Sequence, residues 1–251
     1  MAEKCYACGS PTTSREHVPP KCLFPTELGV NLRKNLLTVP SCDKHNIQKS
    51  DDDEFLLASL AGIIGCNDVG MAHKFTKVDR AIRRSGGRIL KKALKEQRVD
   101  MFATKNGTQI NITWGTPDLK RLNACFALIG KGLFYSQYGH MFEGAVYSEI
   151  VYIPLNDRGR MGYRSFVVDQ MTQELSKTSM KGENSEVFQW RVGPQDVSGA
   201  CCAQLIFYGN LSVFLGFVPK GAPKIVNLYD LAQGAKKPVH IRKDGRTYRI
   251  N

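Results

Sequence analysis

The start of the chain carries the feature that most constrains its fold, two short motifs that contain Cys5, Cys8, Cys42 and His45. A C-x2-C pair is followed, after a long gap, by a C-x2-H pair, so three thiolates and one imidazole are available. Such a donor set is typical of closed, tetrahedral structural zinc sites. The segment between the pairs is rich in proline and glycine, and so short and irregular a segment needs a staple in order to fold. We therefore predict a structural Zn2+ ion bound by these four residues.

The segment between the two motifs presents a carboxylate next to a histidine, Glu16 and His17, and Asn46 directly follows the last predicted zinc ligand. Carboxylate and amide oxygens suit a hard divalent cation such as Mg2+. A neutral imidazole can take up a proton near cellular pH, as a general base must. A lone histidine is more often a surface residue or a hydrogen-bonded core residue. The interpretation of His17 as a general base therefore depends on its combination with Glu16, Asn46 and the two Cys/His motifs. Because successive strand side chains point to opposite faces, Glu16 and His17 need a bent or bulged backbone to act at one site.

Residues 5–53 resemble the HNH endonuclease family through the segments 5–9, 15–19 and 42–50. The resemblance implies a ββα-metal fold on a zinc-knuckle scaffold and metal-dependent hydrolysis of DNA phosphodiester bonds. It implies that His17 is the general base and that Glu16 and Asn46 hold a catalytic Mg2+ or Mn2+. Two positions depart from the commoner family pattern, since Glu16 stands where aspartate is more frequent and His45 where cysteine is usual.

The same resemblance implies supporting roles for further residues. Asn35 matches the middle letter of the family motif and would fix the loop that carries the base, with Asn31 as the fallback for that role. Lys49 lies three residues after Asn46, within one helical turn, and could contact the scissile phosphate. The family also suggests a setting in phage defence or in a mobile element.

The chain is strongly basic, with a formal net charge of +12 from 35 Lys and Arg against 23 Asp and Glu. This charge supports a polyanionic partner such as DNA, although many basic proteins bind none. Basic residues concentrate in residues 77–98, which we predict to be helical and interrupted at Gly86 and Gly87. Either this helix has an ordinary solvated face, or it contacts phosphates through a set of cations. These cations are Arg83, Arg84, Arg88, Lys91 and Lys92.

A change of composition near residue 100 predicts an α+β protein with two domains. Residues 1–100 would form the zinc-stapled nuclease unit, with a helix that starts at the acidic run 51–54 and ends near Gly65 and Gly70. Residues 101–251 would form an α+β domain with a mostly antiparallel sheet, whose role could be recognition, dimerisation or sensing. Its predicted elements are a hairpin around Asn106 and Gly107, a helix over 116–138 capped by Thr116, strands over 146–154, 186–192, 201–207 and 211–218, a helix over 165–176 and a basic hairpin over 238–250.

The sequence also bears on location and partners. No apolar run approaches the ~20 residues that span a bilayer, and the first residues lack the apolar region of a signal peptide. Five of the eight cysteines remain after zinc binding, which fits a reducing cytosol better than a disulfide framework. We expect a cytoplasmic protein without a membrane partner, and double-strand cutting from one active site would favour a homodimer. Two other functions stay open, a non-catalytic zinc-dependent nucleic-acid-binding protein and an HNH-type nuclease that acts on RNA.

Overall fold

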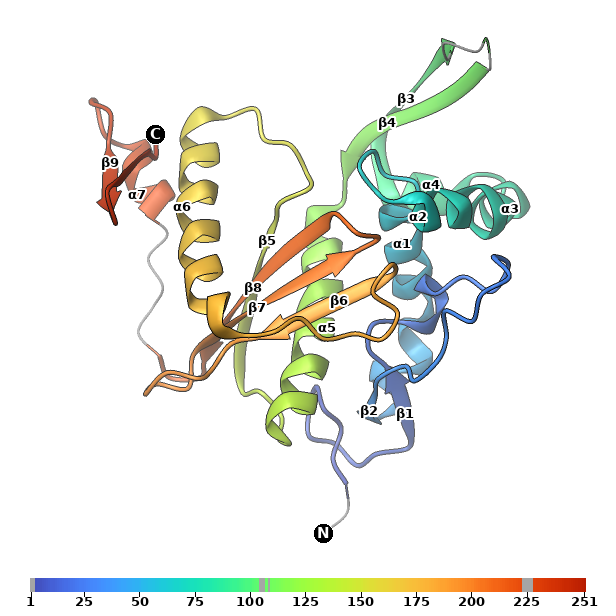
Figure 1. The fold of residues 1–251 in the computed structure, drawn as a ribbon, viewed down its shortest axis with the longest axis horizontal. Coiled ribbons are helices and arrows are strands. Elements are labelled where there is room, and N and C mark those ends of the chain that lie inside the picture. Colours follow the sequence, from blue (N-terminus) through green and yellow to red (C-terminus); the bar gives the residue numbers. More distant parts are fainter. Residues whose placement is uncertain (1–2, 104–106, 108, 223–227) are drawn as a thin grey trace.

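In the computed structural model, residues 3–103, 107, 109–222 and 228–251 are described and form an α+β fold (Figure 1). The chain starts with a short antiparallel pair, β1 (Ser14–His17) and β2 (Thr38–Ser41), with the 3-10 helix η1 (Lys21–Leu23) between them. Two more 3-10 helices, η2 (Asp43–His45) and η3 (Ile47–Lys49), lead into α1 (Ser50–Leu60).

Helix α1 begins at the predicted acidic run, because carboxylates in a first turn interact favourably with the positive end of a helix. It ends at Leu60, earlier than predicted, and α2 (Asp68–His73) follows. The side chain of Asn67 caps α2 by accepting a hydrogen bond from the backbone N–H of Gly70. Gly70 thus lies inside a helix instead of ending one, and a Cβ there would lie 2.9 Å from the ring of Tyr208.

The predicted basic helix is divided and shorter than expected. A π-helical turn, η4 (Lys74–Val78), is followed by α3 (Asp79–Arg84) and α4 (Arg88–Ala93). Gly86 and Gly87 separate α3 from α4 with φ angles of 59° and 79°, a region that favours glycine. The prediction of a helix as far as Arg98 is wrong, because pairing with a later strand overrides the local preference beyond residue 93.

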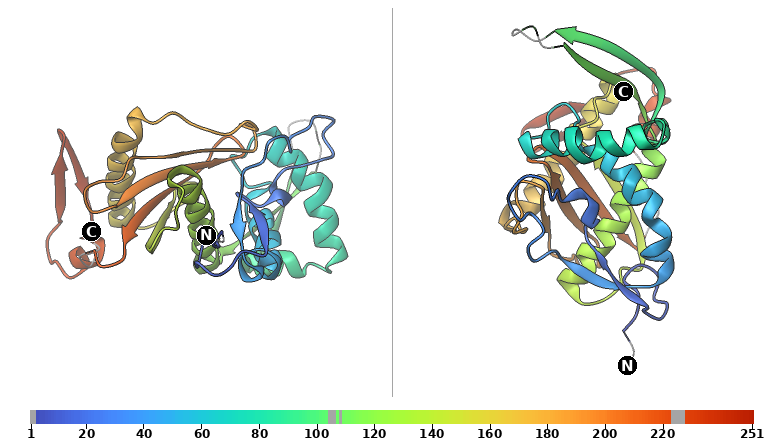
Figure 2. Two further views of the ribbon diagram at one scale, coloured as in Figure 1. Left: turned by 90° about the horizontal axis from the view of Figure 1, so that it is seen from below. Right: turned by 90° about the vertical axis from the view of Figure 1, so that its right-hand side faces the viewer.

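That pairing joins β3 (Leu94–Ala103) to β4 (Gln109–Pro117) in an antiparallel hairpin that projects from the body of the protein (Figures 1 and 2). Asn106 of the predicted turn lies outside the described residues. The predicted domain boundary after residue 100 falls inside β3. Because strand pairing continues to Pro117, Thr116 does not cap the next helix, and Asp118 does so by accepting from the Arg121 N–H.

The main sheet of the described residues contains β5 (Gly144–Ile150), β6 (Phe188–Val192), β7 (Cys201–Phe207) and β8 (Leu211–Pro219). These strands pair antiparallel in the order β5-β8-β7-β6, which confirms a mostly antiparallel sheet. Strand β5 ends at Ile150, because a turn begins at Val151, whereas the sequence predicted a strand to residue 154.

Two long helices cover the sheet. Helix α5 (Leu119–Tyr138) packs against β5, β6 and β8, and α6 (Arg158–Glu174) continues into η5 (Leu175–Lys177) and contacts β7. The predicted helix over 165–176 is therefore confirmed and begins earlier than expected. The chain closes with α7 (Leu228–Gln233) and the predicted basic hairpin of β9 (His240–Lys243) and β10 (Arg246–Arg249).

One cluster of buried hydrophobic residues extends through the protein and includes Phe55 of α1, Phe126 of α5 and Leu205 of β7. Residues on both sides of the predicted domain boundary therefore share a core, with α5 at its centre (Figure 1). All eight cysteines are free thiols. None of the helices in the described ranges is long and apolar enough to cross a bilayer.

Candidate functional site

The four predicted zinc ligands come together beside the β1–β2 hairpin. Cys5 and Cys8 lie in a turn in which the backbone N–H of Gly9 donates to the carbonyl of Cys5 at 2.9 Å. Cys42 and His45 lie in a second turn, in which the N–H of His45 donates to the carbonyl of Cys42 at 3.0 Å. Each motif therefore folds into a tight turn that directs its two ligands to the same point.

The ligand atoms have the spacing of a tetrahedral zinc shell. All four lie within 4.8 Å of one another. The Sγ atoms of Cys8 and Cys42 are 3.7 Å apart, and His45 Nδ1 lies 3.4 Å from Cys42 Sγ and 3.6 Å from Cys5 Sγ. A tetrahedron with Zn–S bonds of about 2.3 Å has edges of about 3.8 Å. Burial, with nearby lysines, lowers the pKa of His45 and favours the neutral imidazole that binds metal. This cluster could therefore hold a zinc ion.

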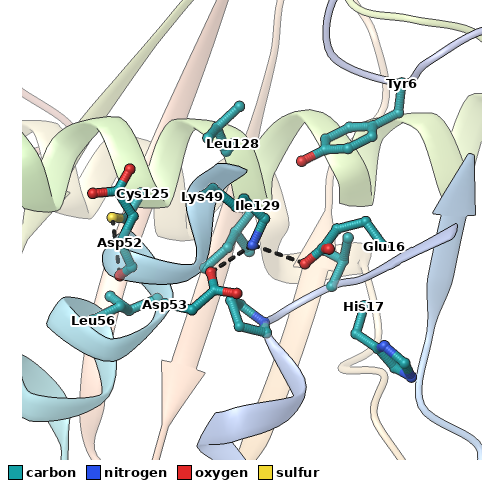
Figure 3. Close-up of a pocket in the computed structure, with 12 residues that line it drawn as sticks. Tyr6, Glu16, His17, Lys49, Asp52, Asp53, Leu56, Cys125, Leu128 and Ile129 are labelled. Atoms are coloured by element: carbon teal, nitrogen blue, oxygen red, sulfur yellow. Dashed lines mark hydrogen bonds and ion pairs between the residues drawn. The ribbon is translucent and has the colours of Figure 1, made fainter. Parts of the chain in front are cut away.

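Glu16 and His17 point to opposite faces of β1 (Figure 3). The pairing with β2 is regular, with Glu16 opposite Val39 and His17 opposite Thr38, so the side chains alternate as in any strand. Glu16 is buried on the side of Tyr6 and α5, whereas His17 is half-buried and directed away from it. Strand β1 therefore lacks the bend or bulge that would bring both side chains to one face.

Lys49 lies at the centre of a buried charged cluster formed with Glu16 and Asp53. Its Nζ is 2.8 Å from Glu16 Oε1 and 2.5 Å from Asp53 Oδ1. Burial raises the pKa of both carboxyl groups, although the neighbouring ammonium opposes this shift. Burial also opposes the charge of Lys49, but the two carboxylates outweigh it and raise the pKa of Lys49. Two carboxylates and one ammonium leave the cluster with one formal negative charge.

This arrangement differs from the predicted role of Lys49. The side chain is 9 % exposed and its ammonium is bonded to two carboxylates, so it does not reach toward a phosphate at the surface. Separating a buried charge from its partners is costly. Asp53 is not among the predicted site residues, although its position four residues after Lys49 is the spacing of a helical ion pair.

A small cavity of about 20 Å³ lies beside this cluster, between β1, α1 and α5. Its lining includes Tyr6, Glu16, Asp53 and Ile129, and His17 borders it as well (Figure 3). A cavity needs about 10–15 Å³ to hold a water molecule. The space is therefore sufficient for a single water and far too small for a nucleotide, which must approach from outside.

His17 is the last residue of β1. Burial lowers its pKa, and the nearby cations Lys21 and Arg33 lower it further, so the imidazole is neutral at cellular pH. Within the described part of the chain, no hydrogen bond engages its ring nitrogens. His17 can therefore accept a proton. Lys21 and Arg33, which are not among the predicted site residues, favour an anionic ligand at this point.

Asn46 lies between η2 and η3 and is fixed against β1. Its Nδ2 donates to Ser14 Oγ at 2.8 Å and to the carbonyl of Arg15 at 3.3 Å. No hydrogen bond from the described residues reaches its Oδ1. The amide nitrogen thus holds the side chain in place and leaves the oxygen free to bind a cation.

The other two predicted asparagines lie in the loop before β2. Asn35 adopts a φ of 49° and its Nδ2 donates to Glu183 Oε2 at 2.6 Å, which ties this loop to the segment before β6. Asn184 strengthens the tie by donating to the carbonyl of Lys34 at 2.9 Å. Among the described residues, the side chain of Asn31 makes only a local hydrogen bond, which its Oδ1 accepts from the backbone N–H of Arg33 at 3.0 Å.

The five predicted phosphate-contacting residues are exposed on α3 and α4, at one end of the long axis of the protein (Figure 1). Lys92 forms an exposed ion pair with Asp51 at 3.3 Å. The other four have no ion pair with any described carboxylate. They are Arg83, Arg84, Arg88 and Lys91.

The structure therefore brings the four zinc donors together at one place and forms a buried Glu16–Lys49–Asp53 cluster at another. His17 lies on the face of β1 opposite to Glu16. Comparisons with known protein families, curated proteins and solved structures find no match for this chain.

Proposed function

We propose that this protein is a metal-dependent DNA endonuclease in which His17 acts as the general base. The observation that carries the proposal is the position of His17 at the end of β1, a strand that Asn46 holds by hydrogen bonds to Ser14 and Arg15. Burial lowers the pKa of His17 and favours the neutral imidazole. The cations Lys21 and Arg33 beside it favour a phosphate, and the resemblance of residues 5–53 to HNH endonucleases supports the same chemistry.

In this proposal the Cys/His cluster holds a structural zinc, and Glu16 and Asn46 hold the catalytic Mg2+ or Mn2+. Among the described residues, neither Asn46 Oδ1 nor Glu16 Oε2 has a hydrogen-bond partner, and the uncompensated negative charge of the Glu16–Lys49–Asp53 cluster favours a cation. A bound divalent ion would supply charge stabilisation at the phosphate. Because His17 ends β1, a phosphate placed across the end of the strand would lie near both of its faces.

The role of His17 in this scheme is to take a proton from the attacking water. Its neutral state at cellular pH follows from burial and from the adjacent cations. Asn46 contributes by fixing the backbone of β1 through the carbonyl of Arg15. Asn35 anchors the loop before β2 to Glu183 and so holds the partner strand of β1.

Plasmid cleavage tests the proposal. Wild type, His17→Ala and His140→Ala are compared with Mg2+, with Mn2+ and without a divalent ion, and zinc content is measured for each protein. His140 is an exposed histidine outside the site, so its removal is the matched control. We expect ion-dependent cutting by wild type and His140→Ala and a loss of at least about 100-fold for His17→Ala. Undiminished cutting by His17→Ala would remove His17 from the base role.

One observation favours a second function, a non-catalytic zinc-dependent nucleic-acid-binding protein. Glu16 Oε1 is paired with Lys49, and Glu16 faces away from His17, so the base and the metal-binding carboxylate are not assembled on one face. This function predicts DNA binding that His17→Ala leaves unchanged and no product strands with any divalent ion. Cutting that requires both the ion and His17 excludes it.

A further inference from the structure

The C-terminal hairpin of β9 and β10 is packed on α6 through one of its two faces. Tyr248 and Ile250 are buried against Phe166 and Tyr163, and the rings of Tyr248 and Phe166 are 5.4 Å apart. The hydroxyl of Tyr248 also donates to Asp169 Oδ2 at 2.7 Å. Apolar packing and a hydrogen bond therefore fix the orientation of the hairpin on the helix.

Two glycines of α6 bring the helix into backbone contact with the end of the chain. A Cβ on Gly162 would lie 1.7 Å from the carbonyl oxygen of Arg249, and a Cβ on Gly159 would lie 2.5 Å from the Cα of Asn251. The side chain of Asn251 accepts a hydrogen bond from the N–H of Val239 at 2.8 Å and closes the base of the hairpin. The hairpin is therefore a rigidly held platform.

The opposite face of this platform is basic. Tyr248 lies opposite Ile241 in the register, and both face α6, so the alternating positions face outward. These positions hold Arg242, Arg249 and His240, all of which are exposed. Residues on diagonal positions of a two-stranded ribbon are about 7–8 Å apart. The outward face thus presents cations at a fixed spacing.

The surrounding sequence adds to this charge. Between residues 236 and 251, six Lys and Arg stand against one acidic residue, Asp244. Arg246 is paired with Asp169 at 2.6 Å. The other five form no ion pair with any carboxylate that the structure describes, and all are exposed. They are Lys236, Lys237, Arg242, Lys243 and Arg249.

We propose that the outward face of the β9–β10 hairpin is a second DNA-binding surface, which contacts the phosphate backbone of duplex DNA. It lies at the opposite end of the long axis from α3 and α4, so the two basic surfaces are separate (Figures 1 and 2). Exposed cations that form no ion pair with a described carboxylate complement a row of phosphates. The proposal deepens the proposed function, since DNA is the shared ligand, but it does not depend on hydrolysis.

The shape of the surface favours a duplex over other polyanions. Single-strand binding uses large aromatic side chains on which bases stack, and Tyr248, the one Phe, Tyr or Trp residue between residues 236 and 251, faces α6. Insertion into a lipid surface uses apolar side chains on the exposed face, and the outward positions of this hairpin carry none. A two-stranded ribbon is also narrow enough to follow a groove of B-DNA.

Fluorescence anisotropy with a labelled 20-base-pair duplex, in a NaCl titration without Mg2+ or Mn2+, tests this surface. The test variant is Arg242→Gln with Arg249→Gln. The matched control is Lys177→Gln with Lys220→Gln, which removes the same charge from exposed positions outside the hairpin. A third variant, Arg242→Gln with Lys237→Gln, keeps the hydrogen bond from Arg249 to the carbonyl of Asn251.

Loss of two phosphate contacts should flatten the slope of log K against log[NaCl] by about 1.8, so the deficit in binding should grow about 60-fold for each tenfold decrease in NaCl. We expect this result for both hairpin variants and an unchanged slope for the control. The same titration is run with one labelled strand of the duplex and with phosphatidylserine vesicles. An equal effect of the control or an unchanged slope in the hairpin variants would overturn the proposal. Tighter binding to the single strand, or an effect of the hairpin variants confined to the vesicles, would overturn it as well. Because no cutting is measured, hairpin-dependent binding by a protein that does not cut would refute only the nuclease.

Discussion

Replacing Lys49 by methionine removes the ammonium between Glu16 and Asp53 and keeps an unbranched side chain of similar length. The side chains of Glu16 and Lys49 are 7 % and 9 % exposed, so the substitution leaves a buried carboxylate without its counter-charge. Removing one partner of a buried ion pair costs about 3–5 kcal/mol. The side chain of Asp53 is 26 % exposed and can regain water, so we expect a loss of unfolding free energy near the lower figure, about 3 kcal/mol.

Urea denaturation at pH 7.5 with zinc present measures this loss. With an m value of about 3 kcal/mol per molar urea, the midpoint should fall by about 1 M. Lys92→Met is the matched control, because the ion pair of Lys92 with Asp51 joins side chains that are 55 % and 74 % exposed. Such a surface pair contributes about 0–1 kcal/mol, so the control should move the midpoint by a third of a molar or less.

The loss should also depend on pH. Burial already raises the pKa of Glu16 and Asp53 above their ordinary values, and in the variant no ammonium opposes it. The folded variant then binds more protons than the unfolded chain. The unfolding free energy of the variant is therefore greatest below a pH of about 4, the pKa of these carboxyl groups in the unfolded chain. It falls as the pH rises through the higher pKa values of Glu16 and Asp53 in the folded protein. A midpoint loss at pH 7.5 equal to that of Lys92→Met, or a loss of the same size at pH 5 and pH 8, would refute the electrostatic role of this cluster.

Two further perturbations test the zinc cluster and the basic helices. Cys42→Ser should abolish zinc binding, as measured by metal analysis, and raise the rate of amide hydrogen exchange in β1 and β2. The reason is that the zinc binding energy contributes to folding in a segment with few other restraints. A variant with full zinc content and wild-type exchange rates would contradict the zinc assignment. Neutralising Arg83, Arg84 and Arg88 together should flatten the salt slope of DNA binding by about 2.7, and an unchanged slope would leave α3 and α4 with an ordinary solvated face.

Local patterns predicted much of the fold. The short, mostly apolar run at residues 201–207 predicted the bounds of β7, and the two Cys/His motifs fold into turns that meet as their spacing indicated. These features depend on short stretches of chain, where residue type and spacing determine the geometry. The hairpin of β9 and β10 follows in the same way from the turn at Asp244 and Gly245.

Features that depend on distant contacts were not predictable from local pattern. The helix over 77–98 ends at Ala93 because Leu94 pairs with Pro117, a partner that the local sequence does not reveal. The burial of Lys49 depends on which face of β1 is covered by α5. Thr116 has the chemistry of a cap, but strand pairing includes it and leaves the cap to Asp118. In each case the tertiary contact outweighs the local preference.

The close packing of α5 restricts how this protein could be divided or recombined. A Cβ on Gly132 would lie 2.6 Å from the side chain of Val18, next to His17, and a Cβ on Gly130 would lie 2.6 Å from Leu215 of β8. Helix α5 thus fits closely both against the residue that follows β1 and against the main sheet. Residues 1–100 excised as a fragment would lose the cover of Val18. Grafting them onto another scaffold would require a helix with glycine at the position that faces Val18, so the candidate site cannot be separated from α5 without replacing that contact.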